Sequence, residues 1–136
     1  MNDISVVRLP AAVPEVPVVA RNAALAYYRD QLGFSLDWSE DGIGLAGISR
    51  DACRLFLANP EYRSSRGTIG PIVIWLNMDS NDEVDELHRE WSGRGARILS
   101  APETKPYGLR EFTATDRDGN IFRVFYDFVT PQLEGK

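Results

Sequence analysis

The stretch PYGLREFTATDRDGNIFRVF, residues 106–125, contains two runs of alternating apolar residues that are separated by a short polar turn. The turn, residues 116–119, suits a tight hairpin because its Gly119 can adopt the left-handed conformation that such turns require. In the second strand, period-two alternation places Arg123 on the face opposite to Phe122 and Val124. A guanidinium in an otherwise apolar strand indicates a role beyond packing.

The composition indicates one globular domain of 136 residues, with 43% hydrophobic content. Fifteen basic and twenty acidic side chains (15 minus 20) give a net charge of -5, which disfavours nucleic acid as a partner. The single cysteine, Cys53, excludes an internal disulfide and a thiolate zinc site, and we expect it to be a buried free thiol. Neither a signal peptide nor a membrane-spanning apolar run is recognisable, so we expect a cytoplasmic protein without a membrane partner.

The first half of the chain predicts one helix and four strands. The helix covers residues 21–33, with Asn22 as its candidate cap and Gly33 as its end. The predicted strands are residues 13–19, 34–38, 43–49 and 53–58.

The second half repeats this order after a polar loop, residues 59–70. A helix is predicted over residues 79–95, with Ser80 or Asn81 as its cap. The predicted strands are residues 72–78, 96–101, 110–115 and 120–128. The sequence therefore predicts an α+β fold of two βαβββ modules, approximately residues 10–59 and 70–129, whose small sheets curve around a shared cleft.

Four segments together resemble the vicinal oxygen chelate superfamily, which includes glyoxalase I, extradiol dioxygenases and the bleomycin resistance proteins. They are YYRDQLGFSLDW, RLFLA, PYGLREF and D-x-D-G-N-I-F-R-V, and the similarity is greatest to the bleomycin resistance proteins. The resemblance extends from about Val13 to Phe128. It implies curved mixed sheets, a homodimer, and ligand crevices where the two chains meet.

The resemblance also locates the three positions at which metal-dependent members of the superfamily carry ligands. Here they fall on Val13, near Val73, and on Arg123. None can bind a divalent cation, because two are aliphatic and a guanidinium offers no lone pair. The only histidine, His88, is placed by helical spacing towards the edge or solvent side of its helix. We therefore predict no metal, no cofactor and no catalytic residue.

Strand alternation predicts which side chains face the cleft. If the even-numbered residues of the last strand pack under the helices, Arg123 and Phe125 face the cleft, where Arg123 either pairs with Glu15 or contacts the ligand. Trp75 and Asn77 alternate with the apolar residues of their strand, which also places them in the cleft. The alternative is that Trp75 is ordinary core filler.

Similarity to the drug-binding proteins adds further positions. Tyr107 corresponds to an aromatic residue that stacks on the planar bithiazole of the drug, although the extra Leu109 follows it here. Asp37 and Trp38 correspond to an acidic and aromatic pair at the drug site, and Phe56 is a further cleft candidate. Trp91 and the Tyr27-Tyr28 pair are assigned to the core.

These observations favour a cytoplasmic homodimer that reversibly binds a planar aromatic glycopeptide or related antitumour antibiotic without changing it. A cationic or amphipathic compound is expected. One alternative is an enzyme of the same fold, either a metal-dependent lyase or dioxygenase, or a metal-free isomerase or hydrolase acting through Glu15 and Arg123. Another is a dimer with an interaction role only.

Overall fold

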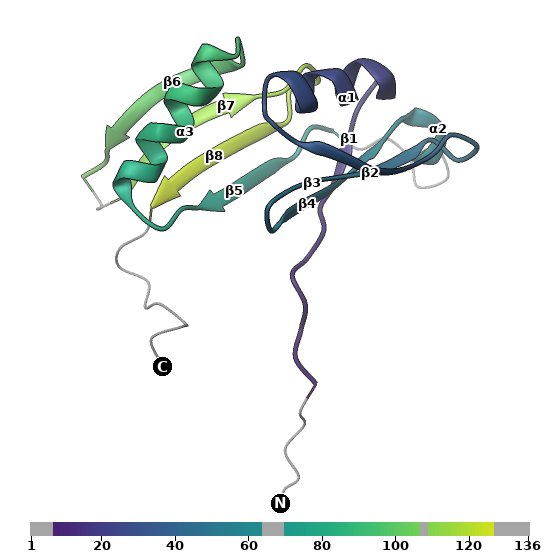
Figure 1. Cartoon of the computed structure of the whole chain (residues 1–136), viewed down its shortest axis with the longest axis horizontal. Helices are drawn as coiled ribbons and strands as arrows, with labels where there is room; N and C mark the ends of the chain where they lie inside the picture. Colours follow the sequence, from purple (N-terminus) through teal and green to yellow (C-terminus); the bar gives the residue numbers. More distant parts are fainter. Residues whose placement is uncertain (1–6, 64–69, 107–108, 127–136) are drawn as a thin grey trace, which may run out of the picture.

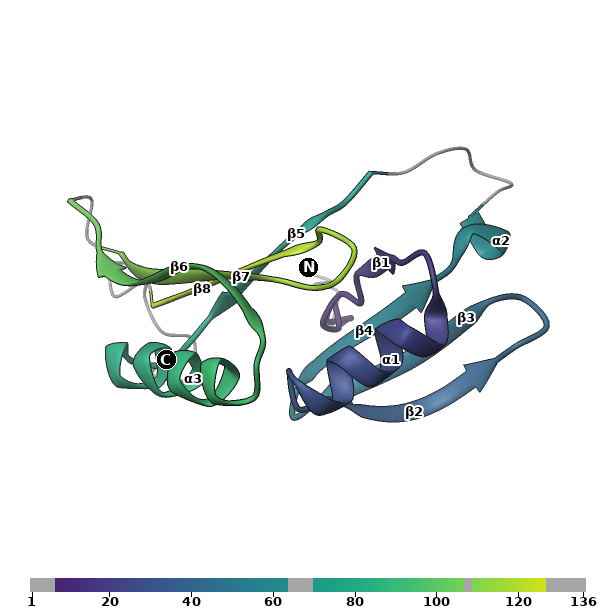
Figure 2. The same cartoon turned by 90° about the horizontal axis from the view of Figure 1, so that it is seen from above.

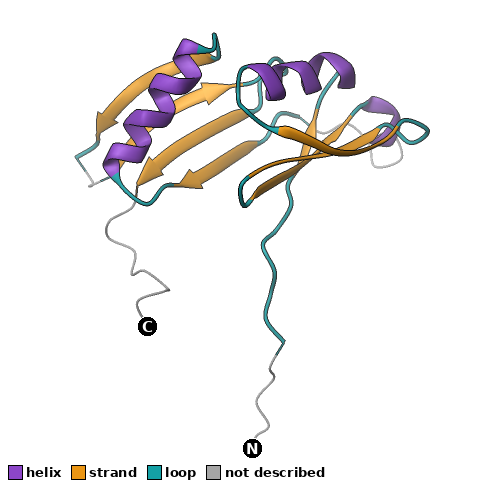
Figure 3. Cartoon of the chain, in the orientation of Figure 1, coloured by secondary structure: helices purple, strands orange, loops and turns teal. Residues whose placement is uncertain are grey.

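The computed structural model of the protein describes residues 7–63, 70–106 and 109–126, which form two modules joined by a short helix (Figures 1 and 3). The first module contains β1 (Glu15–Pro17), α1 (Arg21–Asp30), β2 (Ser35–Glu40), β3 (Leu45–Arg50) and β4 (Cys53–Ala58). The joining helix is α2 (Pro60–Arg63). The second module contains β5 (Val73–Asn77), α3 (Asn81–Gly93), β6 (Arg97–Thr104), β7 (Arg110–Thr115) and β8 (Ile121–Tyr126).

The two sheets have the same topology. Their strand orders are β1-β4-β3-β2 and β5-β8-β7-β6. In each sheet the first strand of the module runs parallel to the last, and the other neighbouring strands are antiparallel. The predicted α+β fold of two βαβββ modules with mixed sheets is therefore confirmed.

Several local boundaries differ from the sequence prediction. Asn22 does not cap α1, because the first helical turn already closes at Ala20, whose carbonyl accepts from Ala24 N at 2.9 Å. Ser80 does cap α3, since its Oγ accepts from Glu83 N at 3.1 Å. The predicted loop after β4 contains α2, and β6 continues three residues past the predicted end at Ala101.

Each long helix covers one face of its own sheet and leaves the other face free of helices (Figure 2). The covered faces meet in one continuous apolar core to which both modules contribute. Tyr28 of α1 lies edge-on to Phe122 of β8, with ring centroids 6.0 Å apart. The indole of Trp91, on α3, donates to the carbonyl of Leu32 at 3.1 Å. The predictions that Trp91 and the Tyr27-Tyr28 pair belong to the core are confirmed.

The turn between β7 and β8 ties the modules together through the buried carboxylate of Asp116. Its Oδ2 accepts from Tyr28 OH at 2.8 Å and from Asn120 Nδ2 at 2.9 Å. Its Oδ1 accepts from the backbone N–H groups of Asp118 at 2.8 Å and Asn120 at 3.0 Å. Asn120 Nδ2 also donates to the carbonyl of Pro17 on β1, at 2.8 Å. The carboxylate thereby satisfies donors from α1 and from its own turn, and Asn120 extends the link to β1.

The environment of Asp116 also determines the protonation state of Tyr28. Burial, followed by the nearby Asp116 carboxylate, raises the pKa of the Tyr28 phenol well above its ordinary value. The phenol therefore remains a hydrogen-bond donor through the neutral range. Gly119 completes the turn at φ +86°, the left-handed conformation predicted for this glycine.

Neither α1, α2 nor α3 offers the length and apolar character that crossing a bilayer would need, and no other helix occurs in the described ranges.

We expect the substitution Asp116→Ala to lower the free energy of unfolding by about 3 kcal/mol or more, because it leaves several buried donors without an acceptor. Urea denaturation followed by circular dichroism measures this loss. Asp82→Ala, at an exposed site in the first turn of α3, is the matched control and should cost less than about 1 kcal/mol. Equal small losses for both variants would contradict the role given to Asp116.

Candidate functional site

The predicted ligand residues lie on the two helix-free sheet faces. Face A, on the first sheet, carries Glu15, Asp37, Trp38 and Phe56, with Gly47 between them. Face B, on the second sheet, carries Trp75, Asn77, Arg123 and Phe125, together with Glu111. Tyr107 lies outside the described residues. The structure thus groups the other predicted residues by face, while their contact with a ligand stays a prediction.

An aromatic pair dominates face A. The rings of Trp38 and Phe56 meet edge to face, with centroids 5.2 Å apart. Gly47 makes this possible, because a Cβ atom at that position would lie only 2.4 Å from Trp38 Nε1. Beside the pair, Ser49 Oγ donates to Asp37 Oδ1 at 3.0 Å. Face A therefore presents an aromatic surface next to a carboxylate.

Face B has its own aromatic pair. Trp75 and Phe125 are also edge to face, with centroids 5.4 Å apart, and the Arg123 guanidinium carbon lies 4.8 Å from the centre of the Trp75 ring. Trp75 is 51% exposed, so the alternative that it fills the core is wrong. The inner side of β5 packs through Ile74, which is buried.

Arg123 is paired with Glu111 on the neighbouring strand. Its Nη2 donates to Glu111 Oε2 at 2.9 Å. Thr113 is the direct cross-strand partner of Arg123, and Glu111 lies two residues away on the same face, within reach of a long side chain. The expected partner, Glu15, lies instead on face A of the other sheet.

Glu111 is a candidate site residue that sequence reasoning missed. It is only 3% exposed although it lies on a helix-free face. The alternation in REFTAT identifies this position. Because Phe112 and Ala114 pack in the core, Glu111 must lie on the opposite face of the sheet, together with Arg123.

The residues at the three expected metal positions do not fit a metal ion. Val13 and Val73 are aliphatic, and Arg123 already binds Glu111. The strand neighbour of Arg123 on β5 is Trp75, which is not a ligand either. Within residues 7–63, 70–106 and 109–126, no three His, Cys, Asp or Glu side chains gather closely enough to hold an ion. His88 is partly buried against Phe112, with ring centroids 5.3 Å apart.

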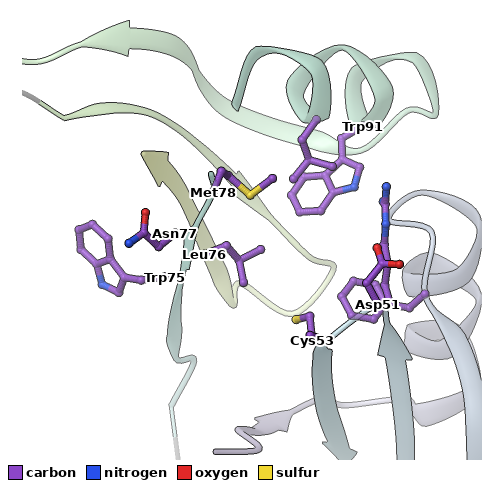
Figure 4. A pocket seen from close by; sticks show the side chains of 11 residues that line it. Asp51, Cys53, Trp75, Leu76, Asn77, Met78 and Trp91 are labelled. Carbon is purple, nitrogen blue, oxygen red and sulfur yellow. The ribbon is translucent and has the colours of Figure 1, made fainter. Parts of the chain in front are cut away.

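A hollow of about 340 Å³ lies between the two modules, on the free edge of β5 (Figure 4). Leu76, Met78 and Trp91 form much of its apolar wall, and Cys53 lines it from β4. Figure 4 shows that Trp75 and Asn77 project to the other side of β5 from Leu76. Trp75 and Asn77 nevertheless also belong to the lining of the hollow, so β5 borders both the hollow and face B.

An ion pair between the modules borders this hollow. Arg50 donates from both Nη atoms to Glu90, at 2.9 and 2.8 Å, and from Nη1 to the carbonyl of Leu32 at 2.8 Å. These hydrogen bonds from Arg50 hold the pKa of the Glu90 carboxyl below its usual range. The pair fixes the turn after β3 against α3.

Comparisons with known proteins agree with this fold. The family model described as the Glyoxalase/Bleomycin resistance protein/Dioxygenase superfamily matches residues 14–124. No curated protein matches the chain in a sequence comparison.

Three similar solved structures illustrate the range of proteins that have this fold. A glyoxalase/bleomycin resistance protein/dioxygenase from Nocardioides is 19% identical with a TM-score of 0.73, and the match covers 93% of this chain and 91% of that one. A lactoylglutathione lyase from Agrobacterium tumefaciens is 23% identical with a TM-score of 0.70, covering 92% and 100%. A bleomycin-binding protein complexed with bleomycin is 20% identical with a TM-score of 0.66, covering 88% and 99%. At these identities the likeness shows the fold alone.

Cys53 offers a direct test of the chemistry available at the hollow. Burial raises the pKa of its thiol, and the positive charge of Arg50 only partly offsets this effect. The thiol should therefore remain protonated at neutral pH and react slowly as a nucleophile. We expect the iodoacetamide reaction of Cys53 to show a midpoint pH above that of N-acetylcysteine amide. A midpoint at or below this reference would show an activated thiol.

Proposed function

Because the chain belongs to the glyoxalase/bleomycin resistance protein/dioxygenase superfamily, we propose that it is a drug-binding protein of the bleomycin resistance type. It reversibly holds a planar aromatic antibiotic, such as a glycopeptide antitumour compound, and withholds it from its target without chemical change. The observation that carries this proposal is the pair of aromatic surfaces on the helix-free faces, Trp38 with Phe56 and Trp75 with Phe125.

The aromatic pairs support the binding of a flat molecule. Tryptophan and phenylalanine rings supply broad contact area at small entropic cost, since few rotatable bonds must be fixed. Gly47 lets Trp38 lie close to β3, and Trp75 leaves half of its surface exposed. A planar ring system can stack on either surface.

The charged groups support holding a ligand rather than a metal-assisted reaction. Arg123 stands where metal-dependent members of the superfamily are expected to carry a carboxylate ligand, and it is joined to Glu111. On face A, Glu15 and Asp37 add negative charge, as does the net charge of -5 of the whole chain. These charges favour a cationic or amphipathic compound over an anionic one.

We also propose that the chain works as a homodimer in the cytoplasm. In an isologous dimer, face A of one protomer meets face B of its partner and forms two equivalent crevices. Val73 and Trp75, both about half exposed on face B, supply apolar surface for such a crevice. The unpaired Cys53 fits a reducing compartment. We propose neither a nucleic acid nor a membrane as a binding partner.

Isothermal titration of the protein with bleomycin, mitomycin C and an enediyne tests the proposal. Effective sequestration requires submicromolar affinity for one compound, roughly -8 kcal/mol or stronger. Failure of every compound in a broad panel of planar antibiotics to bind would contradict the proposal.

For the compound that binds best, Trp75→Ala should weaken binding by about 1 to 4 kcal/mol, because it removes a central aromatic surface. The matched control is Leu99→Ala, which removes an exposed apolar side chain from β6, at the opposite edge of the second sheet. Calorimetry should show unchanged affinity for the control. Unchanged affinity of Trp75→Ala would exclude Trp75 from the site.

A further inference from the structure

The hollow between the two modules occupies a different place from the aromatic surfaces of faces A and B. Its volume is about 340 Å³, towards the lower end of the range of roughly 300 to 1,000 Å³ for small-molecule sites. Four consecutive residues of β5, from Trp75 to Met78, line it together. Because side chains alternate between the two faces of a strand, a hollow lined by all four must lie along the edge of β5. That edge is the outer one of the second sheet.

The walls of the hollow are mainly apolar and come from both modules. Phe34 and Trp91 are almost completely buried core residues, so this part of the wall is already formed without a ligand. Cys53 lies across the hollow from Leu76 and Met78 (Figure 4). Such walls favour a flat apolar group, since burying it removes apolar surface of both partners from water. A fused bicyclic ring system fits this volume, whereas a glycopeptide antibiotic is far too large.

Acidic side chains border the hollow. A second depression adjoins it, because the same three residues line both, namely Arg50, Met78 and Leu87. The charged residues that line the two depressions are Arg50, Asp51, Glu83, Glu86 and Glu90. One positive and four negative charges (1 minus 4) leave a net charge of -3 around the hollow. This excess favours a cationic ligand.

Two of these carboxylates can receive a cation without breaking an existing pair. Asp51 and Glu86 are exposed, and no hydrogen bond or ion pair reaches either from residues 7–63, 70–106 or 109–126. Glu90 is engaged by Arg50, and Glu83 accepts from a backbone N–H group at 3.0 Å. Asp51 lies on the turn between β3 and β4, and Glu86 lies on α3. The two carboxylates therefore approach the hollow from different modules.

We propose that this hollow is a second ligand site, which binds an amphipathic amine with a fused bicyclic aromatic body. The rings lie against Leu76, Met78 and Trp91, and the ammonium group faces Asp51 and Glu86. The site is separate from the aromatic pairs of faces A and B. The inference goes beyond the proposed function and does not depend on it.

Cys53 reports whether the hollow is occupied, because it lines the wall and is the only cysteine of the chain. The probe is naphthalen-1-ylmethanamine, and naphthalen-1-ylmethanol is its neutral analogue of nearly the same shape. The wild-type protein is treated with methyl methanethiosulfonate at neutral pH and low ionic strength, and intact mass spectrometry follows the modification of the thiol. We expect saturating amine to slow this reaction at least about tenfold, because the bound rings cover the sulfur. Half-protection should need at least about threefold less amine than alcohol.

A double variant assigns this preference to the two carboxylates. Asp51→Asn retains a side chain that tolerates the positive φ of 52° at this position, and Glu86→Gln retains the shape of an exposed side chain. When both are combined, we expect the amine and the alcohol to protect Cys53 equally, within about 1.5-fold. The control combines Glu40→Gln and Glu103→Gln, which change the net charge equally at exposed positions of β2 and β6. The control should retain the full preference.

Each result supports or overturns a defined part of the inference. Failure of the amine to protect Cys53 overturns the site, whether the amine binds elsewhere or does not bind. Equal protection of the wild-type protein by amine and alcohol overturns the amine as the ligand class. Full preference in Asp51→Asn/Glu86→Gln, or its loss in the control as well, overturns the role of the two carboxylates. The titrations with bleomycin, mitomycin C and the enediyne judge the proposed function separately.

Discussion

The hydrogen bonds around the Asp116 carboxylate hold the two modules in one arrangement. Tyr28 reaches it from α1, and Asn120 both donates to it and continues to the backbone of β1. Each module alone would leave one apolar sheet face and one apolar helix face incompletely covered, so the shared core requires this contact between them. One side of each sheet packs in this core, and the other side is face A or face B. Fixing the core therefore also fixes the positions of the two faces.

The same alternation along each strand serves stability on one face and, in the proposed function, binding on the other. In β8, Phe122 and Val124 are fully buried under α3, while Arg123 and Phe125 point to face B. Each face carries an aromatic pair. The phenylalanine comes from the last strand of each module, whereas the tryptophan comes from β2 in the first module and from β5 in the second. Where other members of the superfamily are expected to hold a cation, this chain has an internal ion pair. The site is thereby suited to shape, stacking and hydrogen bonding.

The sequence predicts most of the fold because its strands alternate clearly and end at turns. The strands over residues 53–58 and 110–115 have the predicted bounds, and Ser80 caps α3 as expected. α1 starts at residue 21 as predicted, but its cap is Ala20 rather than Asn22, because the first turn closes through the backbone without a side-chain hydrogen bond. The partner of Arg123 depends on the register between β7 and β8, which a single strand pattern does not contain. Glu111, in contrast, follows from the alternation of its own strand. The exposure of Trp75 decides between the cleft and core positions that the sequence left open.

In the proposed function this chain holds its ligand without changing it, and a mass balance tests this property. The protein is incubated with a stoichiometric amount of the compound that binds best, with and without added Zn²⁺, Mn²⁺ or Fe²⁺. It is then denatured, and the released compound is quantified by liquid chromatography and mass spectrometry. Full recovery of the unaltered compound is expected under every condition. Loss of the compound to a new product that forms only with the native protein would contradict it.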